Sequence, residues 1–334
     1  MTLAADLPAV RPAEDAHPAL LPERGWGDRI SAVFWRRPGP LPALLLAPPL
    51  AWLGIVYLGS LAALLLNSFY SIDEFSGRVV HEFTLSTYAE LFRPANLDII
   101  IRTVSMAAAV TVGAVIVGFP IAYFAARYAR GRWKALFYLG VMLPLWSSYL
   151  VKVYAWKLIL AKEGIVNWAV EGLGASVILE AVLSLPVIGG NSLSTSYIGT
   201  WLVFLYVWLP FMILPMQAAL ERVPASMLEA AADLGASGAQ AFRTVIVPLA
   251  MPGIAAGSIF TFSLTLGDYI IPQIIGSSRR FIGQAVYQLQ GTAGNIPLAA
   301  AFAVAPIVIM LVYLWIAKRK AGLRCALRAA RRSA

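Results

Sequence analysis

Six long stretches of this chain contain no Asp, Glu, Lys or Arg, and they constrain its fold more than any other feature. A membrane-spanning helix needs about 20 consecutive, mostly apolar residues. With their ends adjusted, the stretches supply segments close to that length. The predicted spans are residues 42–66, 101–126, 134–153, 197–220, 248–271 and 298–317. The sequence therefore predicts an all-α membrane protein with six transmembrane helices.

The composition excludes the main alternatives to a membrane protein. Residues of the types AVILMFWYC make up 60% of the chain, and Asp, Glu, Lys and Arg make up only 13%. Soluble domains carry about 25% charged residues. So few charges cannot cover a water-soluble core, and the same apolar bias excludes a disordered chain.

The basic residues predict the orientation of these spans. Of the 26 Lys and Arg residues, 18 fall on the side that holds both termini and the second and fourth loops. Cytoplasmic loops carry the excess of Lys and Arg, so we expect both termini in the cytoplasm. The loops on the other side, residues 67–100, 154–196 and 272–297, are long, and residues 173–188 are expected to form an interfacial or re-entrant segment.

A short cytoplasmic helix is expected between the fourth and fifth spans. Ser226 followed by Glu229 matches the S-x-x-E capping box. Good helix formers fill residues 227–234, and Gly235 suits the left-handed position that follows a helix. On helix geometry alone, this segment is as readily a plain connector as a docking surface.

The same loop resembles the cytoplasmic loop of binding-protein-dependent ABC importer permeases. That loop carries E-A-A, three residues, G, nine residues, I, one residue and L-P. Here Glu229-Ala230-Ala231 precedes Gly235, and Val245 and Val247 stand where Ile and Leu are usual. The residues that the resemblance assigns to ATPase coupling are Glu229, Ala230, Ala231, Asp233, Leu234, Gly235 and Pro248.

The resemblance implies a type I ABC importer permease (MetI-like) fold in the bacterial inner membrane. Its implied partners are a dimer of ABC ATPase subunits, a second permease that is a different chain, and a periplasmic substrate-binding protein. Together with the composition, the expected organisation is a flexible cytoplasmic tail (1–40), the first transmembrane helix with a periplasmic loop (41–97), a permease core (98–317) with the coupling helix at 226–235, and a basic cytoplasmic tail (318–334).

Energy must come from outside this chain, because the phosphate-binding signature G-x-x-x-x-G-K-[ST] is missing and no lysine follows a glycine. We therefore expect a transporter subunit rather than an enzyme. A single cysteine, Cys325, and two histidines cannot build a multi-Cys or His-rich metal centre, so neither metal nor cofactor is expected. The basic C-terminal tail is expected to contact anionic membrane lipids rather than nucleic acid.

Four stretches, residues 143–156, 164–167, 209–216 and 266–276, resemble the spermidine/putrescine branch of the family. A polyamine needs carboxylates for its ammonium groups and aromatic faces for its methylene chain. Asp268 is the only acidic residue in a predicted span, which makes it a candidate for the substrate path. The aromatic candidates are Trp146, Tyr149, Tyr154, Trp156 and Tyr269.

Other interpretations of these residues stay open. The aromatic residues are equally typical of a belt at the membrane interface, with Asp268 solvated near the headgroups. Arg102 and Lys152 are expected to extend toward the outer interface. The alternatives for function are a permease for another small organic solute and a gradient-driven secondary transporter. The latter needs paired intramembrane charges or internal repeats, and neither is evident.

Overall fold

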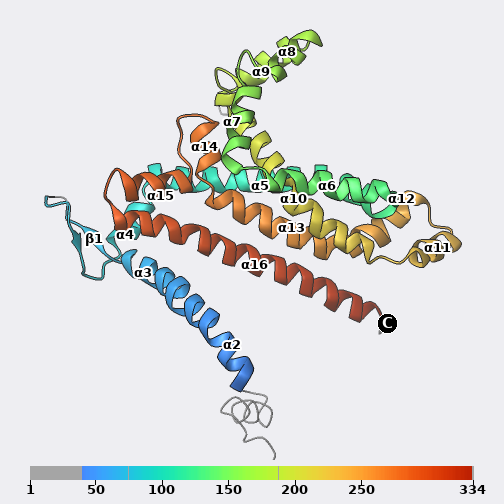
Figure 1. The fold of residues 1–334 in the computed structure, drawn as a ribbon, viewed down its shortest axis with the longest axis horizontal. Coiled ribbons are helices and arrows are strands. Elements are labelled where there is room, and N and C mark those ends of the chain that lie inside the picture. Colours follow the sequence, from blue (N-terminus) through green and yellow to red (C-terminus); the bar gives the residue numbers. More distant parts are fainter. Residues whose placement is uncertain (1–39, 74, 187, 333–334) are drawn as a thin grey trace, which may run out of the picture. The chain divides into compact units, whose positions relative to one another are not determined.

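A computed structural model describes residues 40–332 apart from 74 and 187, and it describes side chains within residues 45–316. The described chain is almost entirely helical (Figure 1). It divides into two compact units, Met1–Ala62 and Ala63–Ala334. The expected N-terminal tail, residues 1–40, lies outside the described residues except for Pro40.

The elements are, in chain order, α2 (Pro40–Ala51), the π-helix η1 (Trp52–Leu58), α3 (Gly59–Asn67), β1 (Ser71–Ile72), β2 (Val79–Val80), α4 (Ser86–Leu91), α5 (Pro94–Arg127), α6 (Arg132–Trp146), α7 (Tyr149–Ile159), α8 (Ile165–Gly172), α9 (Ser176–Leu183), the 3-10 helix η2 (Leu193–Thr195), α10 (Tyr197–Glu221), α11 (Ala225–Asp233), α12 (Gly238–Ala241), the π-helix η3 (Phe242–Ile246), α13 (Val247–Gly267), α14 (Ile270–Ile274), α15 (Ile282–Gly291) and α16 (Ile296–Arg332).

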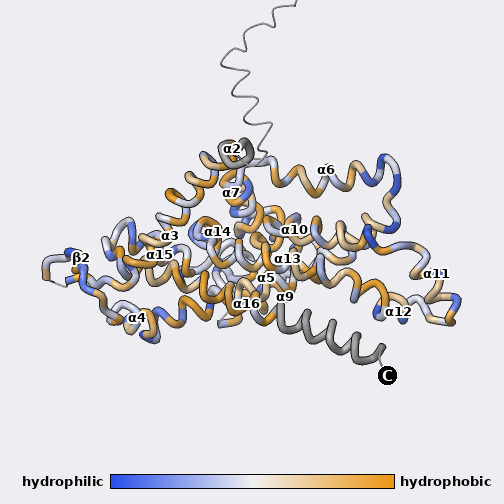
Figure 2. Tube along the Cα trace, turned by 90° about the horizontal axis from the view of Figure 1, so that it is seen from below, coloured by the Kyte–Doolittle hydropathy of each residue, from blue (hydrophilic) through white to orange (hydrophobic). Residues whose placement is uncertain are grey.

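Five helical segments of the described chain are long and apolar enough to cross a membrane. Four of the predicted spans correspond to Leu45–Asn67, Pro94–Arg127, Tyr197–Glu221 and Ile296–Ile316. The fifth segment is Gly238–Gly267, which begins before the predicted span 248–271 and ends inside it. Figure 2 shows apolar residues along α5, α10, α13 and α16, and hydrophilic residues around α11 and α12.

The predicted third span, 134–153, is wrong as a single straight helix. The chain breaks between α6 and α7, which meet at an angle of 96°. Ser147 and Ser148 are extended at the break, and Lys152 donates a hydrogen bond from Nζ to the carbonyl oxygen of Pro144, 2.6 Å away. Lys152 therefore satisfies a carbonyl near the end of α6, where helical carbonyls lose their partners, instead of extending to the interface.

The predicted fifth span also ends early. Asp268 is extended and follows the last residue of α13, so it lies just beyond the spanning helix rather than within it. The chain then forms the short helix α14. The long loops expected on this side contain the helices α7, α8, α9, α14 and α15. The eight residues of α9, inside the segment expected to be interfacial, are too few to span a membrane.

Helix α10 is the centre of the second unit and packs against both α5 and α13. Val203, Phe204 and Met212 on α10 are completely buried. Gly253 and Gly257 on α13 let its backbone approach α10 closely, because a Cβ atom at either position would meet the α10 backbone. Helix α16 packs against α13 and α15, so these helices belong to the same bundle within the second unit.

A two-stranded antiparallel hairpin connects α3 to α4. Ser71 pairs with Val80 and Ile72 with Val79. Gly77 in its turn has φ of +65°, the left-handed conformation that glycine adopts without strain. The hairpin lies at the opposite end of the second unit from α11 (Figure 1).

Candidate functional site

Helix α11 begins differently from the predicted capping box. Pro224 is the N-cap, with extended backbone (φ −64°, ψ 143°), and α11 starts at Ala225. No side chain caps the helix, so Ser226 lies inside the first turn and the expected Ser226–Glu229 box is wrong. Proline at this position explains the shift, because its ring disfavours helical geometry in the residue before it and so separates α11 from α10.

The end of α11 forms as the sequence predicts. Gly235 has φ of +77° and donates its N–H to the carbonyl oxygen of Ala232 at 2.8 Å. Ala236 donates its N–H to Ala231 at 3.0 Å. This pair of bonds is the Schellman motif, and it needs a residue that tolerates positive φ. The chain therefore turns sharply at Gly235 into α12.

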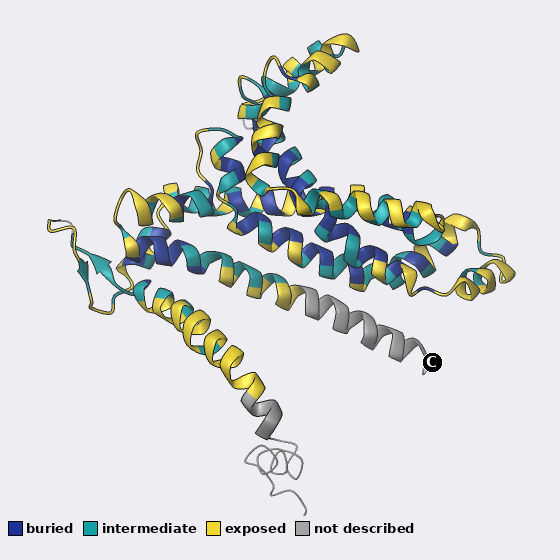
Figure 3. Ribbon diagram, viewed as in Figure 1, coloured by how far each residue is buried: buried dark blue, intermediate teal, exposed yellow. Residues whose placement is uncertain are grey.

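One face of α11 packs on the bundle and the other is exposed (Figure 3). Leu228 packs against the buried cluster that includes Leu220 and Ile246. Leu234 is 88% exposed. Of the motif residues, Glu229, Ala230, Asp233, Leu234 and Gly235 are exposed, whereas Ala231 and Pro248 are partly covered. Pro248 is in the first turn of α13, so it shapes the start of that helix rather than the exposed face of α11.

Glu221, the last residue of α10, ties the end of that helix to α6. Its Oε1 accepts hydrogen bonds from the Tyr138 hydroxyl at 3.0 Å and from Nε2 of Gln217 at 3.1 Å. Lys134 Nζ lies 3.0 Å from the same oxygen. Because α11 begins four residues later, this cluster fixes where the chain leaves the bundle.

At the other end of α13, Asp268 is enclosed by its own chain. The Tyr149 hydroxyl donates to Oδ2 of Asp268, and Oδ1 accepts the N–H groups of Ile270 at 2.7 Å and Ile271 at 3.2 Å. Asp268 thereby caps α14 and joins it to α7. A carboxylate offers about four acceptor positions, so three bonds leave room for one further donor.

The structure brings together only part of the predicted aromatic group. Tyr149 stacks on Trp208, with ring centroids 5.9 Å apart, and Trp156 lies 5.1 Å from Tyr206. Tyr269 stacks on Tyr287 at 5.1 Å. The other two predicted residues are on the surface. Trp146 is 78% exposed and Tyr154 is 54% exposed.

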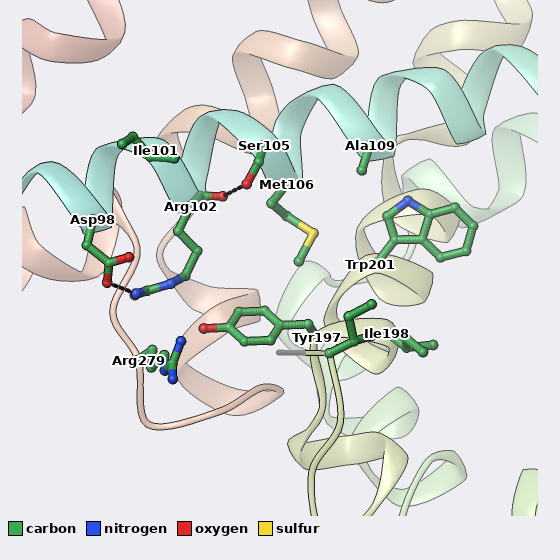
Figure 4. Close-up of a pocket in the computed structure, with 11 residues that line it drawn as sticks. Asp98, Ile101, Arg102, Ser105, Met106, Ala109, Tyr197, Ile198, Trp201 and Arg279 are labelled. Atoms are coloured by element: carbon green, nitrogen blue, oxygen red, sulfur yellow. Dashed lines mark hydrogen bonds and ion pairs between the residues drawn. The ribbon is translucent and has the colours of Figure 1, made fainter. Parts of the chain in front are cut away.

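A cavity of about 540 Å³ lies between α5, α10 and the segment before α15, and sequence reasoning missed it (Figure 4). Arg102 does not extend to the interface as expected. Its guanidinium pairs with Asp98 and donates to the carbonyl oxygen of Arg280 at 2.9 Å. The i, i+4 spacing of Asp98 and Arg102 was the signal that could have predicted the pair. Nothing local in the sequence indicates that Arg279 and Tyr197 line the same cavity.

Comparisons with known proteins show which family this chain matches. Residues 115–320 match the family described as binding-protein-dependent transport system inner membrane component. The chain is 56% identical to the inner membrane ABC transporter permease protein YdcU of Escherichia coli (strain K12), over 89% of this chain and 95% of that protein. It is 29% identical to the spermidine/putrescine transport system permease protein PotB of Haemophilus influenzae, over 70% of this chain and 78% of that protein.

A solved structure shares the fold. A chain of the bacterial alginate ABC transporter, solved with an alginate pentasaccharide-bound periplasmic protein, superposes with a TM-score of 0.61. The match covers 88% of this chain and 96% of that one at 16% sequence identity. At this identity the likeness concerns the arrangement of helices alone.

Proposed function

Because this chain belongs to the family of binding-protein-dependent transport system inner membrane components, and is therefore a multi-pass permease subunit of an ABC importer, we propose that it carries a polyamine such as spermidine or putrescine. The similarity to a spermidine/putrescine permease supports this solute class. So does a carboxylate beside aromatic faces, the pairing that a flexible polycation requires.

Asp268 and Tyr269 are the residues we assign to this solute. Asp268 keeps one acceptor position after its three internal bonds, and Tyr149 and the capped turn hold it in place. Tyr269 is 37% exposed and stacks on Tyr287, which leaves ring surface for a methylene chain. Tyr149 is the positioning residue for Asp268, and Trp156 packs in the core against Tyr206. The exposed Trp146 and Tyr154 fit an interfacial belt.

The observation that carries the mechanism is the exposed face of α11, held at a fixed angle by the left-handed turn at Gly235. We assign it to a groove on a separate ATPase dimer. Closure of the two ATPases on ATP moves the docked helix, and the packed spans follow as a rigid body. A periplasmic binding protein delivers the solute, and a second, different permease completes the path.

The test is ATP-driven spermidine uptake into proteoliposomes that contain the assembled importer. We expect Gly235→Val to abolish uptake, because a β-branched residue at φ of +77° is strained and displaces the turn. Gly238→Ala is the matched control, since a Cβ there meets open space and the backbone is not left-handed. Unchanged uptake by Gly235→Val would contradict the coupling role.

The solute class is tested separately from coupling. With the wild-type importer, spermidine and putrescine should stimulate ATP hydrolysis, and amino acids or sugars should not. Coupled ATP hydrolysis driven only by a non-cationic solute would overturn the polyamine proposal and leave the coupling role intact.

A further inference from the structure

The cavity shown in Figure 4 is divided into a polar end and an apolar end. Asp98, Arg102, Arg279 and the Tyr197 hydroxyl lie toward one end, and Met106, Ala109, Ile198 and Trp201 lie toward the other. Such a division matches a ligand with a charged head and an apolar body.

The polar end has one positive charge to spare. Arg102 is only 12% exposed and its charge is neutralised by Asp98. Within the described residues, the Arg279 guanidinium makes no ion pair or hydrogen bond, and the buried Tyr197 hydroxyl has no partner. A guanidinium beside a hydroxyl donor suits a phosphate oxygen pair. It does not suit a polycation, so this cavity is distinct from the solute site proposed around Asp268.

A centred α5 would place the cavity at the depth of the lipid headgroups. Helix α5 has 34 residues, about 51 Å at 1.5 Å per residue. The hydrocarbon core is about 30 Å thick, so a centred α5 projects roughly 10 Å beyond it at each end. Arg102 is eight residues from the start of α5, roughly 12 Å along the axis, which is near the boundary of the hydrocarbon. Tyr197 and Trp201 are residue types that concentrate at this level.

An apolar track continues from the cavity along α5. Ile101, Val112 and Ile116 are 59%, 58% and 67% exposed. At 100° per residue they fall on one face of the helix, the face that also carries Ser105 and Ala109 of the cavity wall. The track runs from the charged end toward the middle of the span, as an acyl chain does below its phosphate.

We propose that this cavity binds an anionic glycerophospholipid in the leaflet remote from α11. The Arg279 guanidinium and the Tyr197 hydroxyl hold the phosphate, and one acyl chain lies over Met106 and Ala109 and along the exposed face of α5. The single unneutralised guanidinium favours phosphatidylglycerol over phosphatidylcholine, whose choline carries a compensating positive charge. This proposal does not depend on the identity of the transported solute.

The test is native mass spectrometry of the purified importer released from nanodiscs that contain equal amounts of phosphatidylglycerol and phosphatidylcholine. We expect one retained phosphatidylglycerol, with retention at least about tenfold lower in Arg279→Gln. Arg280→Gln is the matched control. This substitution removes the same charge from the same exposed segment, but Arg280 does not line the cavity. Equal retention of the two lipids, or equal losses in the two variants, would overturn the proposal.

Two further measurements distinguish a bound lipid from a small anion and from a protein partner. Ala109→Trp, which fills the apolar end, should lower phosphatidylglycerol retention, whereas soluble glycerol phosphate at the lipid concentration should not displace it. Full displacement by glycerol phosphate would mean that the cavity binds a small anion rather than a lipid. Loss of the second permease from the Arg279→Gln importer, with lipid retention unchanged, would instead make this surface a permease–permease contact.

Discussion

Lys134 Nζ lies 3.0 Å from Oε1 of Glu221, joining the first turn of α6 to the last residue of α10 directly before α11. Glu221 also accepts from Tyr138 and from the buried side chain of Gln217. The same carboxylate thus accepts from the buried Nε2 of Gln217 and fixes the chain directly before α11. These two roles can be separated by mutation.

Glu221→Ala should lower the midpoint of thermal unfolding more than Lys134→Met. The alanine variant leaves the amide of Gln217, which is 1% exposed, without its acceptor, and an unsatisfied buried polar group costs about 1–3 kcal/mol. The methionine variant removes only a partly exposed cation, and exposed ion pairs contribute little. Thermal unfolding in detergent measures both, and equal midpoints would contradict the ranking.

Gly253→Ala should destabilise the helix bundle. Its Cβ would lie 2.5 Å from the carbonyl oxygen of Pro215 and 2.6 Å from Cβ of Ala219. Overpacking of this kind costs about 1–3 kcal/mol. Gly140→Ala on α6 is the control, because a Cβ there meets nothing within 4 Å, and alanine favours a helix over glycine by about 1 kcal/mol. The idea fails if the two variants unfold at the same temperature in the same detergent.

Asp268 can be tested for charge and for capping independently. Asp268→Asn keeps a carbonyl oxygen for the N–H groups of Ile270 and Ile271 but removes the charge. We expect spermidine uptake to fall about tenfold or more in Asp268→Asn, since hydrogen bonds to charged groups are worth about 1.5–3 kcal/mol. Uptake should fall at least as far in Asp268→Ala, which also loses the cap.

The two variants also distinguish a structural role from recognition. Normal uptake by Asp268→Asn together with loss in Asp268→Ala would leave Asp268 as a cap only. Unfolding midpoints of both variants serve as the control, because the asparagine variant should stay close to the wild type.

The single cysteine provides a test of orientation. If both termini are cytoplasmic, as the distribution of Lys and Arg predicts, a membrane-impermeant maleimide should label Cys325 only after the inner membrane is permeabilised. A reciprocal variant, Cys325→Ser with Phe75→Cys, places the thiol in the exposed β1–β2 turn and should be labelled in intact cells. The opposite labelling pattern would invert the topology and place α11 outside the cytoplasm.

Much of the helical framework could be predicted from the chain alone. Long apolar runs without charges predicted four spans, three of them to within three residues at each end, because a bilayer leaves an apolar segment few alternatives to a helix. The span predicted to begin at residue 101 begins earlier, at Pro94, because α5 continues through the charged residues Asp98 and Arg102. The turn at Gly235 was equally predictable, since glycine tolerates the positive φ that ends α11. These features depend on residues that are close together in the sequence.

Tertiary structure decided the features that depend on distant partners. At the break between α6 and α7, Lys152 donates to the carbonyl oxygen of Pro144, and the hydropathy of the sequence does not predict such a bond. Asp268 is positioned by Tyr149, a residue 119 positions away, and the carbonyl oxygen of Arg280 holds Arg102 across 178 positions. Composition and periodicity describe each helix by itself, whereas a polar side chain near a membrane takes whichever partner the folded chain brings within hydrogen-bonding distance.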